Sequence, residues 1–378
     1  MRILLMGLCL SLLAGCLYTP EYNYSPAEEQ RLVGAVLGDV LVEDDSTRLL
    51  GLNDEIESYL DGHIRDSWSD SHKLEELRAL LFGEEHLNIQ YDAATTRTAI
   101  ETFEARQGNC LSMTSLFIAA ARHVGLEADF EIVVVRPTWD HEGGTMIRYE
   151  HIVATGKLRH GESYVVDFLP EFVIGDQRSH YVNDETALSL YYNNLGAEAL
   201  IDGELDKAAE NLRKALALRP GDSDAWSNMG AVMKRSGDAE LAEFSYRRAL
   251  LEDATNYSAL NNLAELYRWM GEEQKAREFM ERVNRYRRRN PYFYFYVAGL
   301  FFREGQFEET AMLLERSIDL KRDEPEFYDA LARTYSRMGD EIKSERYLAL
   351  AEKYRERDFG RREMRTGSRL WTYTIDVN

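Results

Sequence analysis

The chain has 378 residues, enough for two or three domains of ordinary size. Hydrophobic residues make up 44% and charged residues 29% of it, values near the averages of globular proteins, which excludes disorder along the whole chain. Its 45 lysine and arginine residues against 66 aspartate and glutamate residues give a net charge of −21. Such an acidic surface would repel phosphate backbones, so we expect no nucleic-acid partner.

The first residues predict an export signal. Arg2 precedes an apolar run over residues 3–13, which has the length of a secretory signal core and is too short to span a bilayer. The run ends in the tetrapeptide LAGC at residues 13–16, which resembles the lipobox of bacterial lipoproteins. The resemblance implies a signal peptide over residues 1–15 and acylation of Cys16. An ordinary signal peptide with an incidental cysteine is the alternative.

Residues 16–48 are predicted to be a lipidated N-terminus and a tether. Leu17 stands where inner-membrane lipoproteins carry an aspartate, so the resemblance favours the outer membrane, on its periplasmic side. No later apolar run approaches 18 residues. The sequence therefore predicts that acyl chains on Cys16 make the membrane contact. Several acyl chains hold a protein on a membrane far better than one chain does.

The three cysteines of the chain have different expected fates. Cys9 leaves with the signal and Cys16 would be acylated, so Cys110 alone remains, in a compartment that oxidises thiols. No intramolecular disulfide can then form. Cys110 is either a buried, inert thiol or a nucleophile.

Residues 49–185 mix helix and strand signals and predict an α+β domain. Two capped helix starts and a third helix over 96–105 precede an apolar run from Leu111 to Val124, which predicts a buried helix. Cys110 would lie in the first turn of that helix, after a glycine that relaxes the chain. Unpaired backbone N–H groups and the positive helix end favour a thiolate there. The backbone N–H of Cys110 is also placed to face a developing oxyanion.

Three strands are expected after this helix, the last two over 146–155 and 163–168, joined by a hairpin turn. If the turn centres on Arg159, His151 and Asp167 lie directly opposite each other on one face of the sheet. A slip of one residue would place them on opposite faces. A cysteine at a helix start, with a histidine oriented by a carboxylate, is the arrangement of an activated thiol nucleophile.

These residues resemble the transglutaminase-like superfamily, whose members have a papain-like fold. The resemblance rests on the tripeptide GNC at 108–110 before the helix, on EHIV at 150–153 and on VVD at 165–167. Their order and spacing both fit, and the similar stretch covers residues 91–172. The fold expected for this region is therefore papain-like.

The resemblance also implies roles for individual residues. Cys110 would be the nucleophile, His151 the general base and then the general acid, and Asp167 the carboxylate that orients the histidine. The family completes its oxyanion hole with an upstream polar side chain, for which Gln90 and Gln107 are candidates. A degenerate domain, in which Cys110 is structural and the domain only binds, is the alternative.

Other polar residues near these motifs have simpler interpretations. His123, on the buried helix, is expected to be a satisfied helix-face histidine and not the base. His141 lies in a loop and is a candidate substrate-loop residue; Asp140 and Glu142 beside it lack regular metal-ligand spacing. Because no zinc motif or phosphate-binding loop is present either, we assign no metal and no cofactor.

The second half of the chain repeats every 34 residues. The repeat consists of turn glycines, columns of small residues and columns of bulky residues, and it is the tetratricopeptide pattern. It predicts five pairs of antiparallel helices over residues 189–358, stacked into an all-α solenoid. The turn glycines are Gly203, Gly237, Gly271, Gly305 and Gly339, and the first small column is Gly196, Gly230, Ala264, Ala298 and Ala332.

Stacked repeats leave a concave groove on their first helices. The mixture of arginine and aromatic groups expected there would suit an extended acidic or aromatic peptide. A separate arginine cluster is most simply a solvated helix face, with anionic lipid or a protein partner as the alternative. The groove positions are Asn193, Asn261, Arg268, Phe295, Arg303, Arg333 and Arg337, and the cluster is Arg282, Arg285, Arg287, Arg288 and Arg289.

Residues 359–378 form a C-terminal tail, in which the segment 370–375 has strand character and is expected to dock on a sheet edge.

The sequence as a whole predicts a membrane-anchored cysteine enzyme that acts on amide bonds, with the repeats recruiting a protein or peptide. Hydrolysis is favoured over transfer because water needs no second substrate pocket. A non-catalytic envelope adaptor, whose repeats bind a protein, is the alternative function.

Overall fold

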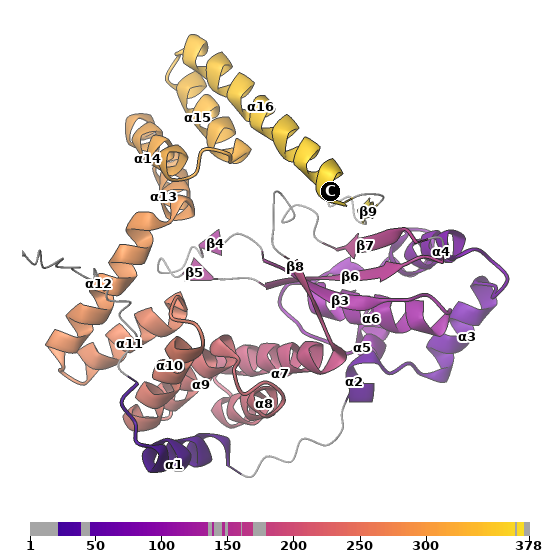
Figure 1. Ribbon diagram of the computed structural model, residues 1–378, viewed down its shortest axis with the longest axis horizontal. Coiled ribbons are helices and arrows are strands. Elements are labelled where there is room, and N and C mark those ends of the chain that lie inside the picture. The colour runs from indigo at the N-terminus through magenta and orange to yellow at the C-terminus, as the bar shows by residue number, and fades with distance from the viewer. Residues whose placement is uncertain are drawn as a thin grey trace, which may run out of the picture.

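A computed structural model of the chain shows an α+β domain followed by an array of helix pairs, which curves until the chain returns to the domain (Figure 1). This architecture confirms the predicted fold class. The predicted signal peptide and Cys16 lie outside the described part of the chain. The structure describes residues 22–38, 46–134, 138–139, 146–147, 150–159, 161–168, 179–366 and 369–373.

A five-stranded sheet forms the centre of the α+β domain, in the order β8-β3-β6-β7-β9. β6 pairs antiparallel with β3 and β7, β8 pairs antiparallel with β3, and β9 pairs parallel with β7. Short strands β1 and β2 form a parallel pair, and β4 and β5 an antiparallel pair. The strands are β1 (Gln90–Tyr91), β2 (Gln107–Gly108), β3 (Asp129–Val134), β4 (Thr138–Trp139), β5 (Met146–Ile147), β6 (Glu150–Lys157), β7 (Ser163–Asp167), β8 (Ser179–Val182) and β9 (Arg369–Tyr373).

Helix α6 (Cys110–His123) packs against this sheet, and its residues from Leu111 to Ala121 are all buried. The ring of Phe117 lies against the rings of Tyr164 and Phe168 from the sheet. The predicted buried helix is thus confirmed, and an apolar face of the sheet covers it. Four further helices belong to this domain: α2 (Ser46–Leu50), α3 (Asp54–His63), α4 (Asp70–Phe82) and α5 (Ala99–Ala105).

Within residues 179–366, five helix pairs follow one another, as the 34-residue period predicts. Each turn glycine of the period adopts a positive φ between 77° and 86°, which side chains with a Cβ rarely adopt. At Gly230 an added Cβ would lie 2.6 Å from the ring of Tyr246. The small residue at this position of the 34-residue period therefore lets the paired helices approach closely. The pairs are α7 (Asp184–Ile201) with α8 (Leu205–Leu218), α9 (Ser223–Arg235) with α10 (Ala239–Glu252), α11 (Tyr257–Trp269) with α12 (Glu273–Arg289), α13 (Pro291–Arg303) with α14 (Phe307–Leu320), and α15 (Pro325–Arg337) with α16 (Glu341–Thr366).

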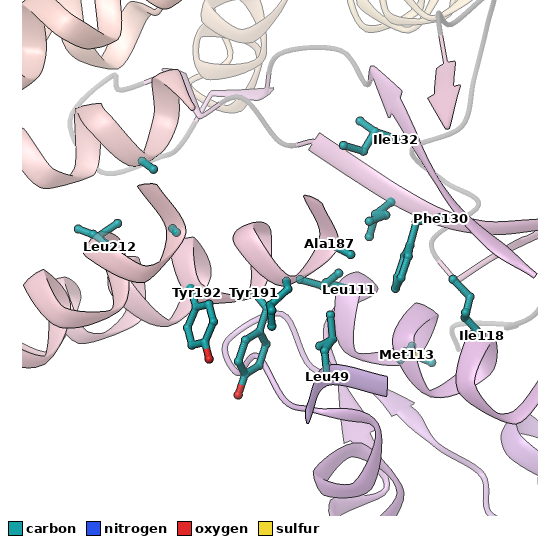
Figure 2. Packing of buried hydrophobic residues seen from close by; sticks show 14 of the residues in the cluster. Leu49, Leu111, Met113, Ile118, Phe130, Ile132, Ala187, Tyr191, Tyr192 and Leu212 are labelled. Atoms are coloured by element: carbon teal, nitrogen blue, oxygen red, sulfur yellow. The ribbon is translucent and has the colours of Figure 1, made fainter. Parts of the chain in front are cut away.

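The α+β domain and the first repeats share one hydrophobic core. Figure 2 shows Leu49 of α2, Leu111 of α6 and Tyr191 of α7 side by side at this junction. The far end of α6 is held as well, because Arg122 donates hydrogen bonds of 2.6 and 3.0 Å to Asp184 at the start of α7. The helix that begins with the cysteine is therefore fixed to the first repeat.

Part of the predicted tether folds as helix α1 (Pro26–Leu37), which packs against α8 and α10. Ser25 and Glu28 form a capping box at its start, and Leu32 and Val36 are buried. The apolar spacing of this segment, combined with its cap, explains why it folds on the repeats. In the described part of the chain, no helix has the length and apolar character needed to cross a bilayer.

The chain returns to the sheet after the last repeat. Helix α16 is 26 residues long and leads towards β9, which pairs with β7 along the edge of the sheet (Figure 1). Sequence analysis expected a strand over 370–375 that docks on a sheet edge, and the structure places it at 369–373. The repeats therefore connect two parts of one domain.

Candidate active site

The start of α6 is built around Asn109. This residue caps the helix, since its buried side-chain oxygen accepts a hydrogen bond from the backbone N–H of Ser112 at 3.0 Å. Gly108 is needed here for space, because a Cβ on it would lie 2.6 Å from the Cβ of Ser112. The sequence prediction was that this glycine relaxes the chain, whereas the structure shows a close approach. Cys110, the first helical residue, is half-buried.

His151 on β6 and Asp167 on β7 form a buried pair. Nε2 of His151 lies 2.7 Å from Oδ1 of Asp167, and the two side chains are 4% and 1% exposed. An aspartate buried so deeply holds the imidazole in one orientation, as the third member of a catalytic triad does.

The predicted register of β6 and β7 is wrong by two residues. Ala154 pairs with Val166 and Lys157 with Ser163, so the turn centres on residue 160 and not on Arg159. His151 and Asp167 are therefore diagonal neighbours and not direct partners. A shift of two residues preserves the face of the sheet, and diagonal neighbours lie within reach of long side chains. The contact that the sequence predicted thus forms in a different register.

Cys110 and His151 are also brought together, close enough for the cysteine to raise the pKa of the imidazole. Since Nε2 of the ring faces Asp167, the nitrogen that remains for the thiol is Nδ1. Burial lowers the pKa of His151, but its hydrogen bonds and charge interactions with Asp167 and Cys110 outweigh burial and raise the pKa to about 9. His151 is accordingly an imidazolium near neutral pH, and a cationic imidazole beside a thiol is an arrangement that activates cysteine nucleophiles.

Three further hydrogen bonds position the cysteine helix, and the sequence prediction missed all of them. The hydroxyl of Thr114 donates to the carbonyl of Ile152 at 3.2 Å, which links α6 to the strand residue next to His151. The side-chain amide of Asn109 donates to the hydroxyl of Thr96 at 2.6 Å, and Glu198 of α7 accepts from the backbone N–H of Thr96 at 2.9 Å. These partners lie 13 to 102 residues apart, and no local pattern marks them.

The two oxyanion-hole candidates lie upstream of the cysteine. Gln90 and Gln107 face each other as register partners of the β1–β2 pair, and both are exposed. The side-chain amide of Gln90 donates to Asn88, at 2.6 Å to its side-chain oxygen and 3.1 Å to its carbonyl. The assignment of either glutamine to the oxyanion hole stays a prediction.

His123 and His141 are the other two histidines that the sequence singled out. His123 contacts Asp61 at 2.9 Å on the outer side of α6, as expected for a satisfied helix-face histidine. His141, Asp140 and Glu142 lie outside the described residues. Among the residues that the structure describes, no three His, Cys, Asp or Glu side chains converge as metal ligands would.

The groove of the repeats and the candidate site are joined by a hairpin. Strands β4 and β5 belong to the segment between β3 and β6, and they contact α13 and α11 (Figure 1). A hollow of about 410 Å³ lies on this array, and its lining includes the predicted groove residues Phe295 and Arg333. The strand that carries His151 therefore begins three residues beyond a hairpin that touches the repeats.

The fold and the site together define a transglutaminase-like α+β domain joined to tetratricopeptide repeats. Family models agree: residues 68–168 match the transglutaminase-like superfamily, and residues 190–222 match a tetratricopeptide repeat. No curated protein matches the chain. Both families are those that the sequence patterns predicted.

Three solved structures that resemble the chain each cover less than half of it. A MamA structure from MSR-1 is 18% identical and covers 45% of this chain and 97% of its own, with a TM-score of 0.24. MamA from Desulfovibrio magneticus RS-1 is 15% identical and covers 45% and 96%, with a TM-score of 0.25. The Pseudomonas aeruginosa protein pilF is 21% identical and covers 45% and 78%, with a TM-score of 0.27. TM-scores this low carry no conclusion about function.

Proposed function

We propose that this protein is a cysteine enzyme that acts on amide bonds of a protein or peptide. The observation that carries the proposal is the buried His151–Asp167 pair beside a half-buried cysteine at the start of a helix. A cysteine that served only to fill the core would need neither a cationic histidine nor an aspartate behind it. The family match over residues 68–168 supports the same class of chemistry.

The residues support a two-step reaction. The Cys110 thiolate attacks the amide carbonyl carbon, and the backbone N–H of Cys110, which no helical partner accepts, faces the developing oxyanion. His151 gives its proton to the leaving nitrogen as the C–N bond breaks, which leaves an acyl group on the sulfur. A water molecule then attacks the thioester while His151 takes its proton, and the C–S bond breaks. An amine in place of water would give transfer; hydrolysis needs no second pocket and is the form we propose.

The repeats would recruit the substrate. The β4–β5 hairpin contacts α11 and α13 and leads directly into the strand of His151, so a polypeptide held on these helices would lie beside the hairpin. The hollow on the array is lined by Phe295 and Leu348, which suit an aromatic or apolar side chain, and by both acidic and basic groups, Glu326, Asp329 and Arg333. We also propose that acyl chains on Cys16 anchor the protein in the cell envelope, with the outer membrane favoured and the domains facing the periplasm.

The reaction of Cys110 with iodoacetamide as a function of pH tests the catalytic proposal, in signal-less protein with Cys16 removed. We expect fast labelling of the folded protein near neutral pH, slow labelling in His151→Ala, and no loss in the matched variant His123→Ala. Cys110→Ala should abolish cleavage of a casein or peptide-library substrate. Labelling that appears only on unfolding would contradict the proposal and favour the non-catalytic adaptor.

The anchor is tested separately. The N-terminal peptide of protein purified from the membrane fraction should begin at Cys16 and carry the mass of acyl chains. Cys16→Ser should release the protein from that fraction. An unmodified peptide, or a Cys16→Ser variant that stays in the membrane fraction, would refute the anchor without bearing on the catalytic site.

A further inference from the structure

The described chain begins on the outer side of the repeats, against the middle of α10. The ring of Tyr22 lies 6.2 Å from that of Phe244, and its hydroxyl is 3.5 Å from a guanidinium nitrogen of Arg248. Arg248 also binds Glu29 of α1 at 2.6 Å and Glu252, the last residue of α10, at 3.0 Å. These contacts fix the point at which the N-terminal segment reaches the repeats.

The segment before this point is short. Tyr22 is six residues beyond Cys16, and six extended residues span roughly 20 Å at most. If Cys16 is acylated, as proposed above, the bilayer surface must lie within about that distance of Tyr22, which packs on the middle of α10. The contacts of Tyr22 therefore determine which surface of the repeats faces the membrane.

The end of α12 lies at the same edge of the array. Arg287 donates to the hydroxyl of Tyr257 at 2.5 Å, and Tyr257 begins α11 only five residues after α10 ends. In the 34-residue frame, Arg285 takes the place that Leu251 holds on α10, and the side chain of Leu251 is 47% exposed. The ends of α10 and α12 thus form one continuous edge.

This edge carries three exposed arginines, which we call the arginine edge: Arg285, Arg288 and Arg289. Within the described residues, none of them has an ion pair or a side-chain hydrogen bond. A cation at a helix C-terminus stabilises the helix by interacting with its dipole. One arginine is enough for that effect, so it does not explain three. Glu281, one turn earlier, is the acidic residue nearest to them on the exposed side of the helix. Three unpaired cations are a local exception on a chain with a net charge of −21.

We propose that the arginine edge docks on the anionic phospholipid surface of the membrane in which Cys16 is anchored. This inference rests on the proposed lipid anchor. Anionic headgroups complement the three guanidinium groups, the exposed Leu251 beside them can enter the interface, and the short segment brings both to the bilayer. Acyl chains on Cys16 hold the protein on the membrane at one point only, so an electrostatic contact at the arginine edge would hold the repeats in one orientation.

The proposal can be tested on a chain that begins at Cys16 and carries Cys110→Ser. Cys16 is alkylated with a single 14-carbon chain, and partition is measured by co-sedimentation with phosphatidylcholine vesicles and with vesicles that also contain 30% phosphatidylglycerol. Each arginine near an anionic surface contributes about 1 kcal/mol, so the anionic lipid should raise partition on the order of 100-fold. The gain should shrink as salt rises.

The triple variant Arg285→Gln, Arg288→Gln and Arg289→Gln should lose this gain while binding phosphatidylcholine as before. The control variant replaces three exposed cations elsewhere, Arg65, Arg346 and Lys353, by Gln and should keep it. A gain that survives in the triple variant, or disappears equally in both variants, would overturn the proposal. So would an unaltered partition on anionic vesicles, which would favour an acidic protein as the partner. Because the alkyl chain is attached chemically, these outcomes do not depend on whether Cys16 is acylated in cells.

Discussion

The two halves of this protein hold their important residues in place by different means. In the repeats, each helix packs on its immediate neighbours, and one 34-residue period sets turn, spacing and core at once. In the α+β domain, Cys110, His151 and Asp167 come from three elements and meet through contacts across long stretches of chain. A change in a repeat should therefore cost stability, whereas a change at the site should cost chemistry while the fold persists.

The largest effect should come from removing the charge of Asp167. Asp167→Asn keeps the shape of the buried pair but no longer stabilises an imidazolium, so activity should fall on the order of 10³–10⁴-fold. Cys110 alkylation near pH 7 should fall less, roughly 10-fold or more, because an ordinary thiol still ionises in part at that pH. The matched control is Asp61→Asn, which alters the exposed pair with His123. An unchanged melting temperature in both variants would show that the loss of activity does not come from unfolding. Equal activity in the two variants would contradict the role given to Asp167.

The pH dependence of stability should report the same pair. Because His151 has a pKa raised to about 9 in the folded protein, its contribution is fully present below pH 6.5 and is lost as pH rises through 9. The free energy of unfolding should fall by up to about 3 kcal/mol over that interval. Urea unfolding from pH 6 to 10 measures this fall, and His151→Gln should flatten it. An equally steep fall in that variant would assign the effect to other groups.

In the repeats, two glycine substitutions should have opposite signs. Gly230→Ala would place a Cβ 2.6 Å from the buried ring of Tyr246 and should destabilise the protein by about 1–3 kcal/mol. Gly299→Ala, on α13, meets nothing within 4 Å and should stabilise by up to about 1 kcal/mol, since alanine favours helix. Denaturant midpoints decide the sign. Neither change should alter Cys110 alkylation; a change there would show that the halves are more tightly coupled.

A substitution at the junction tests that coupling directly. Glu198→Ala removes the acceptor of the Thr96 N–H and should destabilise by about 1–2 kcal/mol. Because Thr96 holds the cap of the cysteine helix, alkylation should also slow several-fold. Glu210→Ala, an exposed change one helix away, should do neither. If Glu198→Ala lowers stability without slowing alkylation, Glu198 supports the junction and not the site.

The sequence predicted the repeats almost completely, because a fixed period repeats its information five times. It also predicted the helix of Cys110 and the contact of His151 with Asp167. These predictions came from the order of the motifs and from the side of the sheet that each strand residue faces. The strand register was wrong by two residues, since turn length between Lys157 and Ser163 is set by local hydrogen bonds that composition does not reveal. The bridge from Glu198 could not be predicted, because its partners share no pattern along the chain.

The strand β9 has a consequence for how the protein is made. Its partner β7 ends at Asp167, about two hundred residues before residues 369–373. Until that last segment docks, the edge of β7 is an open row of backbone donors and acceptors, which invites pairing with other chains. The newly made chain must keep this edge shielded until its final strand arrives.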